Sequence, residues 1–574
     1  MSGDTLVYDM SSMSEGTPQV FVKKDYLQIL DNQNGNYNGN QSVVDTSQLA
    51  NSNKYMNYRE AYLSVPLVLT VSSTTANLVN PATEATSIDM GFGLRNWFGS
   101  IVHSFTLDYN GTTIIQQTPY CGMFNTFRLM TTLSLQDVLT NGASMGFYPD
   151  DPLSFGFSVV AGNLNGLGTF NKINGIEGDV VSAQFTGFKR GNEGFLKRQQ
   201  YISYDPDALT AGGATFADNQ ATFGSLLPAT ACQTLYKSYI VSKSNATHSI
   251  QYAIMSFIQL KHLHNFFQNI PLLKGVFMKM TLNLNQSSLT LTTTNGTTTG
   301  FGNTPIVINS PLGGISPIMI ASASDEGVAS GLFAGINFTV TGVITASLAV
   351  GSKPILASQS AFAGGLAPSI QLNVPAYTFN PVFEDAYLAD PVKTIVYSDI
   401  YQYQVLNVAS GATFNNLITN GIANIKSVLI LPFYTSTANG NIEPFQSPFT
   451  GEGSGTTSPL CLLTSFNVVV AGQNMIYNTQ QYSYQQFLEQ LQGCNAVNAN
   501  QTDGLTSSLV SQLGFEMMYN YYYVNCSRML PVEESVPKSV SIIGRNLSAK
   551  AINLFVFIEY GVQVSVDVLT GARV

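Results

Sequence analysis

The sequence predicts an all-β protein with short helices, organised as two β-sandwich domains in tandem. In several segments apolar residues alternate with polar ones, as in Met278–Leu284 and again where valine occupies every second position from Val562 to Val568. This period of two is typical of a strand in a sheet with one buried face. Helix-like patterns are short and few, and turn-rich loops separate the strands. Together these observations favour sandwich domains of the jelly-roll kind.

The first strands are predicted near the N-terminus. Gln19–Leu30 has the composition of a strand and leads into the Asn-rich loop Asp31–Asn40. Tyr58–Val71 is a second strand region. Its Pro66 predicts an edge strand or a bulge, because proline cannot donate a hydrogen bond to a neighbouring strand.

Two short helices are predicted from apolar residues that recur three and four positions apart. The first of them is closed by Pro271, since proline ends a helix. The two apolar faces are Leu260, Leu263, Phe267 and Ile270 in the first half, and Tyr484, Phe487, Leu488 and Leu491 in the second.

One β unit is predicted to occur twice. Ser104–Gly111 and Ser465–Gly472, which begin 361 residues apart, share one pattern of apolar and polar residues without a gap. An apolar pair and an aromatic-containing, helix-like segment follow each glycine. Asn110-Gly111 is a strong hairpin signal because both residues tolerate positive φ. A chance match in a β protein of low complexity is the alternative.

The predicted domain organisation follows from this duplication. Residues 1–18 form an N-terminal arm, and 19–290 form the first jelly roll. The Thr-, Gly-, Ser- and Ala-rich stretch 291–367 is expected to supply connecting strands and loops, and 368–574 the second jelly roll. The boundary between the two halves is placed only to within tens of residues.

Charge is scarce in this chain. Charged residues make up 10% of its 574 residues, where a typical soluble domain has about 25%. Much of the surface is therefore neutral or covered by other subunits, which indicates an assembly. A net charge of -10 without a basic cluster argues against broad binding of nucleic acid or of an anionic membrane, and no direct, sequence-specific nucleic-acid partner is expected. Polar residues interrupt every long uncharged stretch and the N-terminus lacks a signal-like pattern, so neither a transmembrane segment nor secretion is predicted.

The cysteines and histidines show no metal-site spacing. The five cysteines are odd in number and far apart, which favours reduced thiols over a disulfide framework. His262 and His264 are two residues apart on a predicted helix and so point to different faces. The full sets are Cys121, Cys232, Cys461, Cys494 and Cys526, and His103, His248, His262 and His264.

Acidic residues occur in pairs, but the sequence places no pair across a cleft, as glycoside hydrolysis requires. These pairs are Asp150 and Asp151, Asp205 and Asp207, Asp325 and Glu326, and Glu533 and Glu534. The Asp-Pro-Asp at 205–207 is more simply a turn, with a calcium site as the alternative. We assign no catalytic, cofactor-binding or metal-binding residue, and we expect the chain not to be an enzyme.

Three further features are interpreted structurally. Gly451–Gly455 lacks the lysine of a phosphate loop and is expected to be a flexible surface loop. The aromatic run Tyr519–Tyr523 has no interleaved Arg or Lys, so intersubunit packing or core burial is favoured over base stacking. Trp97, the single tryptophan, is predicted to lie in the core.

Four runs of sequence resemble a known family. Leu30–Tyr37 and Tyr58–Leu69 are similar to the first jelly roll of the major capsid proteins of virophages and polinton-like viruses. Tyr397–Val408 and Tyr521–Glu534 are similar to runs in the second half of the same proteins. The resemblance implies a double jelly-roll coat protein of the adenovirus-like lineage.

This resemblance also implies a role. In that family three chains form a pseudo-hexameric trimer, and trimers tile an icosahedral shell around a double-stranded DNA genome. Expected partners are the chain itself, penton proteins and minor capsid proteins, in a virion assembled inside the host cell. Segments 295–303 and 435–458 are expected to be exterior loops, and the arm to lie on the inner face. The alternatives are a jelly-roll protein that binds or hydrolyses carbohydrate, and a viral spike or secreted adhesin.

Overall fold

The fold is taken from a computed structural model of the chain. It describes residues 19–33, 35, 37, 39–73, 90–150, 155–157, 188–190, 193–201, 240–243, 248–286, 288–292, 306–309, 317–322, 337–344, 369–435, 461–476, 482–493, 509–517, 519–527 and 535–574. The predicted arm 1–18, the loop 451–455 and the exterior segments 295–303 and 436–458 lie outside these residues.

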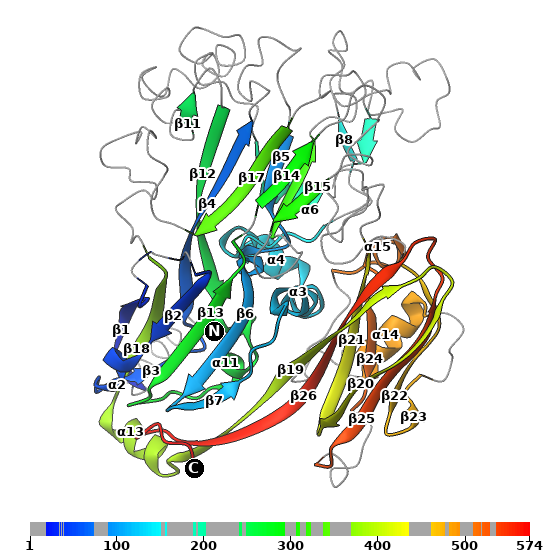
Figure 1. The fold of residues 1–574 in the computed structure, drawn as a ribbon. Coiled ribbons are helices and arrows are strands. Elements are labelled where there is room, and N and C mark those ends of the chain that lie inside the picture. Colours follow the sequence, from blue (N-terminus) through cyan, green and yellow to red (C-terminus); the bar gives the residue numbers. More distant parts are fainter. Residues whose placement is uncertain are drawn as a thin grey trace, which may run out of the picture.

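The first half folds as a jelly roll of two four-stranded antiparallel sheets (Figure 1). One sheet has the order β1-β18-β4-β12 and the other β2-β13-β6-β7. Numbered along the chain, the strands pair as first–eighth–third–sixth and second–seventh–fourth–fifth, which is jelly-roll order. The eight strands are β1 (Phe21–Leu30), β2 (Gln41–Asp45), β4 (Tyr62–Ser73), β6 (Val102–Tyr109), β7 (Thr112–Ile115), β12 (His248–Gln259), β13 (Met278–Leu284) and β18 (Gln371–Phe379).

The second half repeats this order strand for strand. Its sheets are β19-β26-β21-β24 and β20-β25-β22-β23. Helix α14 (Tyr484–Gly493) lies between its fifth and sixth strands, as α3 (Cys121–Thr132) does in the first half. The strands are β19 (Val392–Val408), β20 (Thr413–Ile422), β21 (Ile425–Tyr434), β22 (Leu463–Val470), β23 (Gln473–Asn474), β24 (Tyr522–Asn525), β25 (Lys538–Asn546) and β26 (Ile552–Asp567). The structure therefore confirms that one β unit is built twice.

The repeated sequence pattern forms the same hairpin in both halves. Asn110 and Gly111 connect β6 to β7 with φ of 46° and 81°, and Ala471 and Gly472 connect β22 to β23 with φ of 50° and 80°. Two successive positive φ values are typical of the type I′ turn, whose twist matches that of the strands. The sequence match thus reflects one local geometry used twice.

Several strands lie outside this plan, in segments inserted into the first jelly roll. Strands β14, β15 and β17 extend its first sheet beyond β4, while β5, β10 and β16 form a small separate sheet. The additional strands are β3 (Tyr55–Met56), β5 (Met90–Leu94), β8 (Phe155–Phe157), β9 (Phe188–Arg190), β10 (Gln199–Tyr201), β11 (Ile240–Lys243), β14 (Ser288–Thr292), β15 (Ile306–Asn309), β16 (Ile318–Ser322) and β17 (Asn337–Ile344). The remaining helices are α2 (Ser47–Ala50), η1 (Phe98–Ile101), α4 (Leu135–Met145), α6 (Glu193–Arg198), α10 (Leu260–Leu263), α11 (Phe266–Asn269), α13 (Pro381–Leu388) and α15 (Gln512–Met517).

The strand pairing bears on where the first unit ends. A division at residue 368 puts β18 in the second half, but β18 pairs with β1 and β4 and is the eighth strand of the first jelly roll. The described strands of 291–367 pair with those of the first half. We propose that the first unit extends to Phe379 and that the second begins with β19. Local patterns missed this because the partner of β1 lies more than 300 residues away in the sequence.

Pro66 is accommodated in a way that the sequence did not predict. Strand β4 is central, with β12 along one side, so the prediction of an edge strand is wrong. On its other side β4 pairs with β18 only as far as Ser64, and its pairing with β17 begins at Leu67. Pro66 therefore lies in the gap between two partner strands, where no backbone N–H is needed on that side.

The predicted helix between Leu260 and Ile270 is interrupted. Helix α10 ends at Leu263 and α11 begins at Phe266, and His264 between them has extended backbone. The apolar face is buried as expected, with Leu260 and Phe267 both fully inaccessible. The predicted face of α14 is confirmed, because Phe487 and Leu491 are buried.

The two jelly rolls are held together by a long ribbon. Strands β19 and β26 pair over most of their length and run below the first jelly roll toward α13 and the C-terminus (Figure 1). There the Lys274 amide donates to the carbonyl of Val568, and the Asn110 side chain donates to the carbonyl of Gly571. A single apolar core runs through both halves. The chain is therefore one body rather than two domains on a tether.

Candidate functional site: the junction of the two jelly rolls

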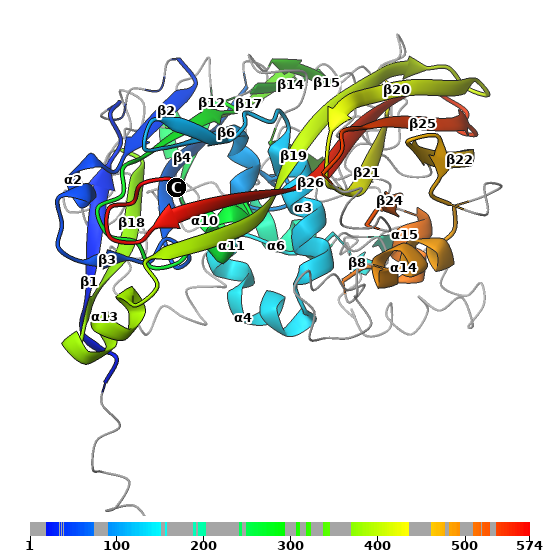
Figure 2. The same cartoon turned by 90° about the horizontal axis from the view of Figure 1, so that it is seen from below.

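Helix α3 lies between the two jelly rolls and carries an aromatic stripe toward the second. Phe124 and Phe127 are three residues apart, which places them on one face of α3, and Tyr120 immediately precedes the helix. Figure 2 shows α3 beside the second jelly roll's β19-β26-β21-β24 sheet, and the partner rings belong to β26 and to the start of β24. The ring-to-ring distances are 5.2 Å from Tyr120 to Phe555, 5.8 Å from Phe124 to Phe557, 5.1 Å from Phe127 to Tyr521 and 5.4 Å from Phe127 to Tyr523.

The predicted core aromatics belong to this layer or lie next to it. In the run Tyr519–Tyr523 all four tyrosines are at most 3% exposed, which confirms core burial for this run. Trp97 is 1% exposed, as predicted. The stripe on α3 was not singled out from the sequence, although its spacing is visible there. The second jelly roll covers that face of α3, and local periodicity does not reveal which element covers a helix.

A buried polar network crosses the junction at Asp399. The Ile400 amide donates to Asp399 Oδ1 at 2.8 Å, and the Tyr560 hydroxyl donates to Oδ2 at 3.2 Å. From the first jelly roll, the Gln116 amide donates to Oδ2 at 3.4 Å, and His264 Nε2 lies 3.4 Å from Oδ1. Asp399 and His264 are 3% and 6% exposed. A buried carboxylate with this many donors fixes the two halves in one relative position.

The hydrogen bonds of His264 define its tautomer. The Phe266 amide donates to Nδ1 at 3.2 Å, so this nitrogen is an acceptor and the proton lies on Nε2, facing Asp399. The same bond caps the start of α11. His264 is thus a positioning group between two elements, and this role depends on the backbone turn that separates it from His262.

The other histidines lie in separate environments. His262 packs edge-on against Trp97 with ring centroids 6.3 Å apart, so His262 and His264 do not come together. Burial lowers the pKa of His262 to about 3 and that of His103 to about 4. Both imidazoles are therefore neutral at pH 7. His248 lies on β12.

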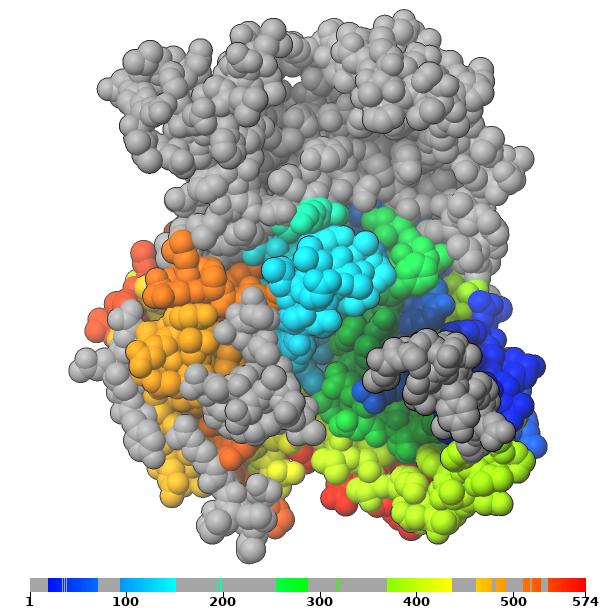
Figure 3. Space-filling view, turned by 180° about the vertical axis from the view of Figure 1, so that it is seen from behind, coloured from blue at the N-terminus to red at the C-terminus, as the bar shows by residue number. Residues whose placement is uncertain are grey.

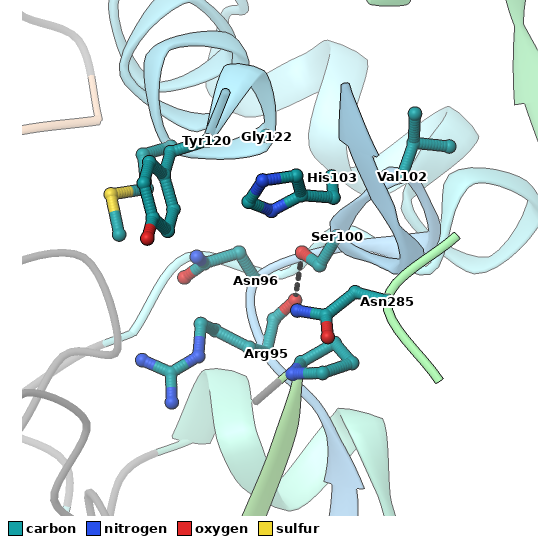
Figure 4. Close-up of a pocket in the computed structure, with 10 residues that line it drawn as sticks. Arg95, Asn96, Ser100, Val102, His103, Tyr120, Gly122 and Asn285 are labelled. Carbon is teal, nitrogen blue, oxygen red and sulfur yellow. Dashed lines mark hydrogen bonds between the residues drawn. The ribbon is translucent and has the colours of Figure 1, made fainter. Parts of the chain in front are cut away.

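A small cleft beside the junction contains His103 (Figure 4). Arg95, Asn96, Ser100 and Tyr120 also line it. Tyr120 has left-handed backbone, with φ of 57°, just before α3, and its ring packs against His103 at 4.7 Å. The Ser100 hydroxyl donates to the carbonyl of Arg95. Because the hydroxyl proton is donated to this carbonyl, Ser100 does not donate to His103, as the serine of a nucleophile–base pair would.

Of the predicted acidic pair Asp150 and Asp151, the structure describes Asp150, whose carboxylate forms a buried ion pair. Asp150 accepts a hydrogen bond from Arg198 Nη2 at 2.6 Å, with both side chains at most 3% exposed. The Tyr519 hydroxyl donates to the Asp150 carbonyl, so this ion pair also contacts the second jelly roll. The sequence did not reveal Arg198 as the partner, since 48 residues separate the two. Asp151 and the other paired acids lie outside the described residues.

The described cysteines, histidines and acids do not form a metal centre. Cys121, Cys461 and Cys526 are buried thiols outside any disulfide, and burial raises the pKa of Cys121 to about 12. Cys232 and Cys494 lie outside the residues that the structure describes. Within those ranges no three His, Cys, Asp or Glu side chains gather closely enough to hold a metal ion. Nor does any helix there have the length and apolar character needed to cross a membrane.

Comparison with known proteins gives structural neighbours only. No protein-family model matches the chain, and neither does any curated protein. Among solved structures, the chain is similar to a chain of the Sputnik virophage, with 10% identity, a TM-score of 0.45, and coverage of 98% of this chain and 89% of that one. It is similar to the mavirus major capsid protein, with 11% identity, a TM-score of 0.44, and coverage of 97% and 90%. For the Faustovirus major capsid protein the values are 10%, 0.43, 96% and 91%.

The mavirus and Faustovirus chains are described as major capsid proteins. The assignment of this chain to the double jelly-roll class rests on its own strand order, which repeats twice without a missing strand.

Proposed function

We propose that this chain is a viral major capsid protein whose pseudo-hexameric trimers tile an icosahedral shell around a double-stranded DNA genome. One observation carries the proposal: a single chain holds two jelly rolls of identical strand order, fixed to each other by a buried junction. Three such chains present six similar units, and six similar units fit a hexagonal lattice site. Tiling requires the same contacts to recur across the surface, which suits a repeated rigid unit.

The surface supports an assembly. Exposed apolar side chains recur on the outer strands, including Val22 at 66%, Tyr26 at 63%, Val396 at 52% and Leu406 at 62% exposed. Subunit contacts cover such residues in an assembled protein. The scarcity of charge fits the same view, because charged residues are depleted at the cores of interfaces.

The sequence resemblance adds independent support. Tyr58–Leu69 covers most of β4, and Tyr397–Val408 covers most of β19. Both runs therefore lie in framework strands of the two jelly rolls rather than in loops. Under this proposal the partners are other copies of the chain, penton proteins and minor capsid proteins, the protein resides in the virion, and assembly takes place in the host cell.

The first test is the mass of the purified protein in solution, by light scattering, followed by negative-stain imaging. We expect a species of three times the 61.9 kDa chain mass with a hexagonal outline, or closed shells. A protein that stays monomeric at every concentration and forms no larger assembly would contradict the proposal. Binding and hydrolysis assays on a glycan panel would then test the carbohydrate-active alternative.

A further inference from the structure

Two histidines lie beside helix α3, the element that joins the two jelly rolls. His103 packs on Tyr120 just before the first turn of the helix, and Figure 4 shows the two side chains together in the small cleft. Tyr120 also contacts Phe555 of the second jelly roll, at 5.2 Å between ring centres. Toward the other end of α3, the charge of Arg128 acts on His262. A change in the charge of either imidazole therefore acts on the helix at the junction.

The surroundings of His103 disfavour a positive charge. The cleft beside it has a volume of about 40 Å³, and the titratable groups that line it besides His103 are the Arg95 guanidinium and the Tyr120 hydroxyl. None of these described lining residues is an acid. The N-terminal end of α3 adds a partial positive charge, as the start of a helix does. Burial lowers the pKa of His103 to about 4, and a proton there has no compensating acid in the cleft.

His262 lies among cations. Burial is the main cause of its low pKa, and the charges of Lys261 and Arg128 lower it further. Asp137 of α4, an acid of this region, acts on Lys261. The Asn125 side chain of α3 donates to a backbone carbonyl of α10 at 2.9 Å, so the two helices are in contact here. A proton on His262 therefore repels α3 through like charges.

We propose that acid opens the junction: protonation of His103 and His262 releases α3 from the second jelly roll, and the two halves move apart while each stays folded. Figure 3 shows that the segment with α3 and α4, in cyan, reaches the surface between the second jelly roll, in orange, and the first, in green and blue. Water and protons therefore have access to this part of the junction. The inference goes beyond the proposed function because it concerns a single chain. If that function holds, the same opening weakens the shell in an acidic compartment.

His264 is not part of this response, because it faces a carboxylate. Its Nε2 lies 3.4 Å from Asp399, and its ring packs edge-on against Tyr397 with centroids 5.9 Å apart. Tyr560, which donates to Asp399, is a further titratable group in this network. A positive charge on His264 is compensated by Asp399, so we expect this contact to persist when α3 is released.

The size of the response follows from the two pKa values. An imidazole in water has a pKa of about 6.5, whereas in the closed junction the pKa is about 4 for His103 and about 3 for His262. The open form therefore binds more protons than the closed form between these values. From pH 7 to pH 5 the ratio of open to closed chains rises about 20-fold for each histidine, and about 500-fold for both together.

Trp97 reports on this opening. It is the single tryptophan of the chain, is 1% exposed, and packs edge-on against His262 with ring centroids 6.3 Å apart. It directly precedes η1, which packs on α3. Acrylamide quenches the fluorescence of a tryptophan only where it reaches the ring, so quenching measures the release of α3. We expect weak quenching at pH 7 and strong quenching at pH 5, with an unchanged far-ultraviolet circular dichroism spectrum.

The variant His103→Gln with His262→Gln removes both titrating groups. At pH 5 we expect it to show the weak quenching of wild type at pH 7. The matched control is His248→Gln, because His248 begins β12 and α10 follows the opposite end of that strand, so this variant responds as wild type does. Circular dichroism at pH 7 checks folding. Where the double variant does not fold, the single variants replace it, and each retains a shift of about 20-fold instead of about 500-fold.

Quenching that stays weak in wild type at pH 5, or that rises equally in the histidine variants, would overturn the proposal. Loss of the circular dichroism signal together with the rise would also overturn it, because the whole chain would then unfold. These measurements use the chain in solution and do not depend on a shell. Acid opening in a chain that never assembles would support this inference and contradict the capsid role. Shells built from a chain whose quenching does not change with pH would do the reverse.

Discussion

At the residue scale, neighbouring side chains with the same chemistry have opposite roles. His264 forms hydrogen bonds through both ring nitrogens and links two jelly rolls. His262, two residues earlier, has a buried Nδ1 without a hydrogen-bond partner and packs on Trp97. The break between α10 and α11 turns the two side chains into different surroundings. One histidine therefore stabilises a polar network, and the other is held in its neutral form.

The neutral state of His262 predicts a pH dependence of stability. Its pKa is about 3 in the folded chain and about 6.5 when unfolded, so between these values the unfolded state binds more protons. The free energy of unfolding therefore falls as the pH falls below about 6.5. From pH 7 to pH 5 the loss from this group is about 2 kcal/mol. Urea unfolding at both pH values measures it.

The control for this prediction is His262→Gln, which removes the titrating group. Carboxylates and the other histidines contribute equally to both proteins, so the difference between the two pH effects isolates His262. We expect the variant to lose about 2 kcal/mol less than wild type over this pH range. Equal losses in the two proteins would show that His262 is protonated in the folded state.

At the element scale, the two equivalent hairpins differ in how well their turn residues fit. Both turns require positive φ at two positions, and the first uses Asn110 where the second uses Ala471. Asparagine visits this region readily, whereas alanine has a steric cost. Asn110 also accepts a hydrogen bond from the Phe277 amide through its side chain at 3.1 Å. The second hairpin therefore contains backbone strain that the first avoids.

Ala471→Asn is expected to stabilise the chain by about 0.5 to 1 kcal/mol, because the new side chain tolerates the left-handed backbone. The measurement is the midpoint of denaturant unfolding. Gly472→Ala is the matched opposite: nothing lies within 4 Å of the added Cβ, so the φ of 80° alone makes it destabilising. If both substitutions shift the midpoint in the same direction, turn geometry does not explain the effect.

At the scale of the whole molecule, the junction couples the two jelly rolls. Aromatic rings of α3 pack against the β19-β26-β21-β24 sheet, and the hydrogen bonds of Asp399 also join the two halves. We expect wild type to unfold in one calorimetric transition. Phe124→Ala with Phe127→Ala removes the layer, and each loss costs about 3 to 5 kcal/mol. The double variant is then expected to show two transitions, one for each jelly roll.

Phe466→Ala is the control for this experiment. Phe466 is 2% exposed and packs inside the second jelly roll against Tyr482 and Tyr522. Its loss removes one buried ring, where the junction variant loses two, and does not touch the junction, so the midpoint falls while a single transition remains. Two transitions in this control, or one in the junction variant, would show that coupling does not depend on the aromatic layer.

The contrast between what the sequence predicted and what it missed has a physical basis. The hairpins at Asn110 and Ala471 were visible because turn chemistry and strand alternation act over a few residues. The partner of β1, the central position of Pro66 and the pairing of Asp150 with Arg198 were not visible. They depend on jelly-roll topology, which brings together segments separated by long insertions. Local rules therefore gave the unit and its repetition, but neither the limits that we propose for it nor the junction.

The order of the strands along the chain also determines when the second jelly roll can be completed during translation. In each jelly roll the eighth strand lies between the first and the third, so β26 separates β19 from β21. Until residues 552–567 leave the ribosome, β19 and β21 each have an unpaired edge, and the β19-β26-β21-β24 sheet is incomplete. The sheet that receives α3 is finished only when this strand arrives. Translation thus delays completion of the junction until residues 552–567 have been made.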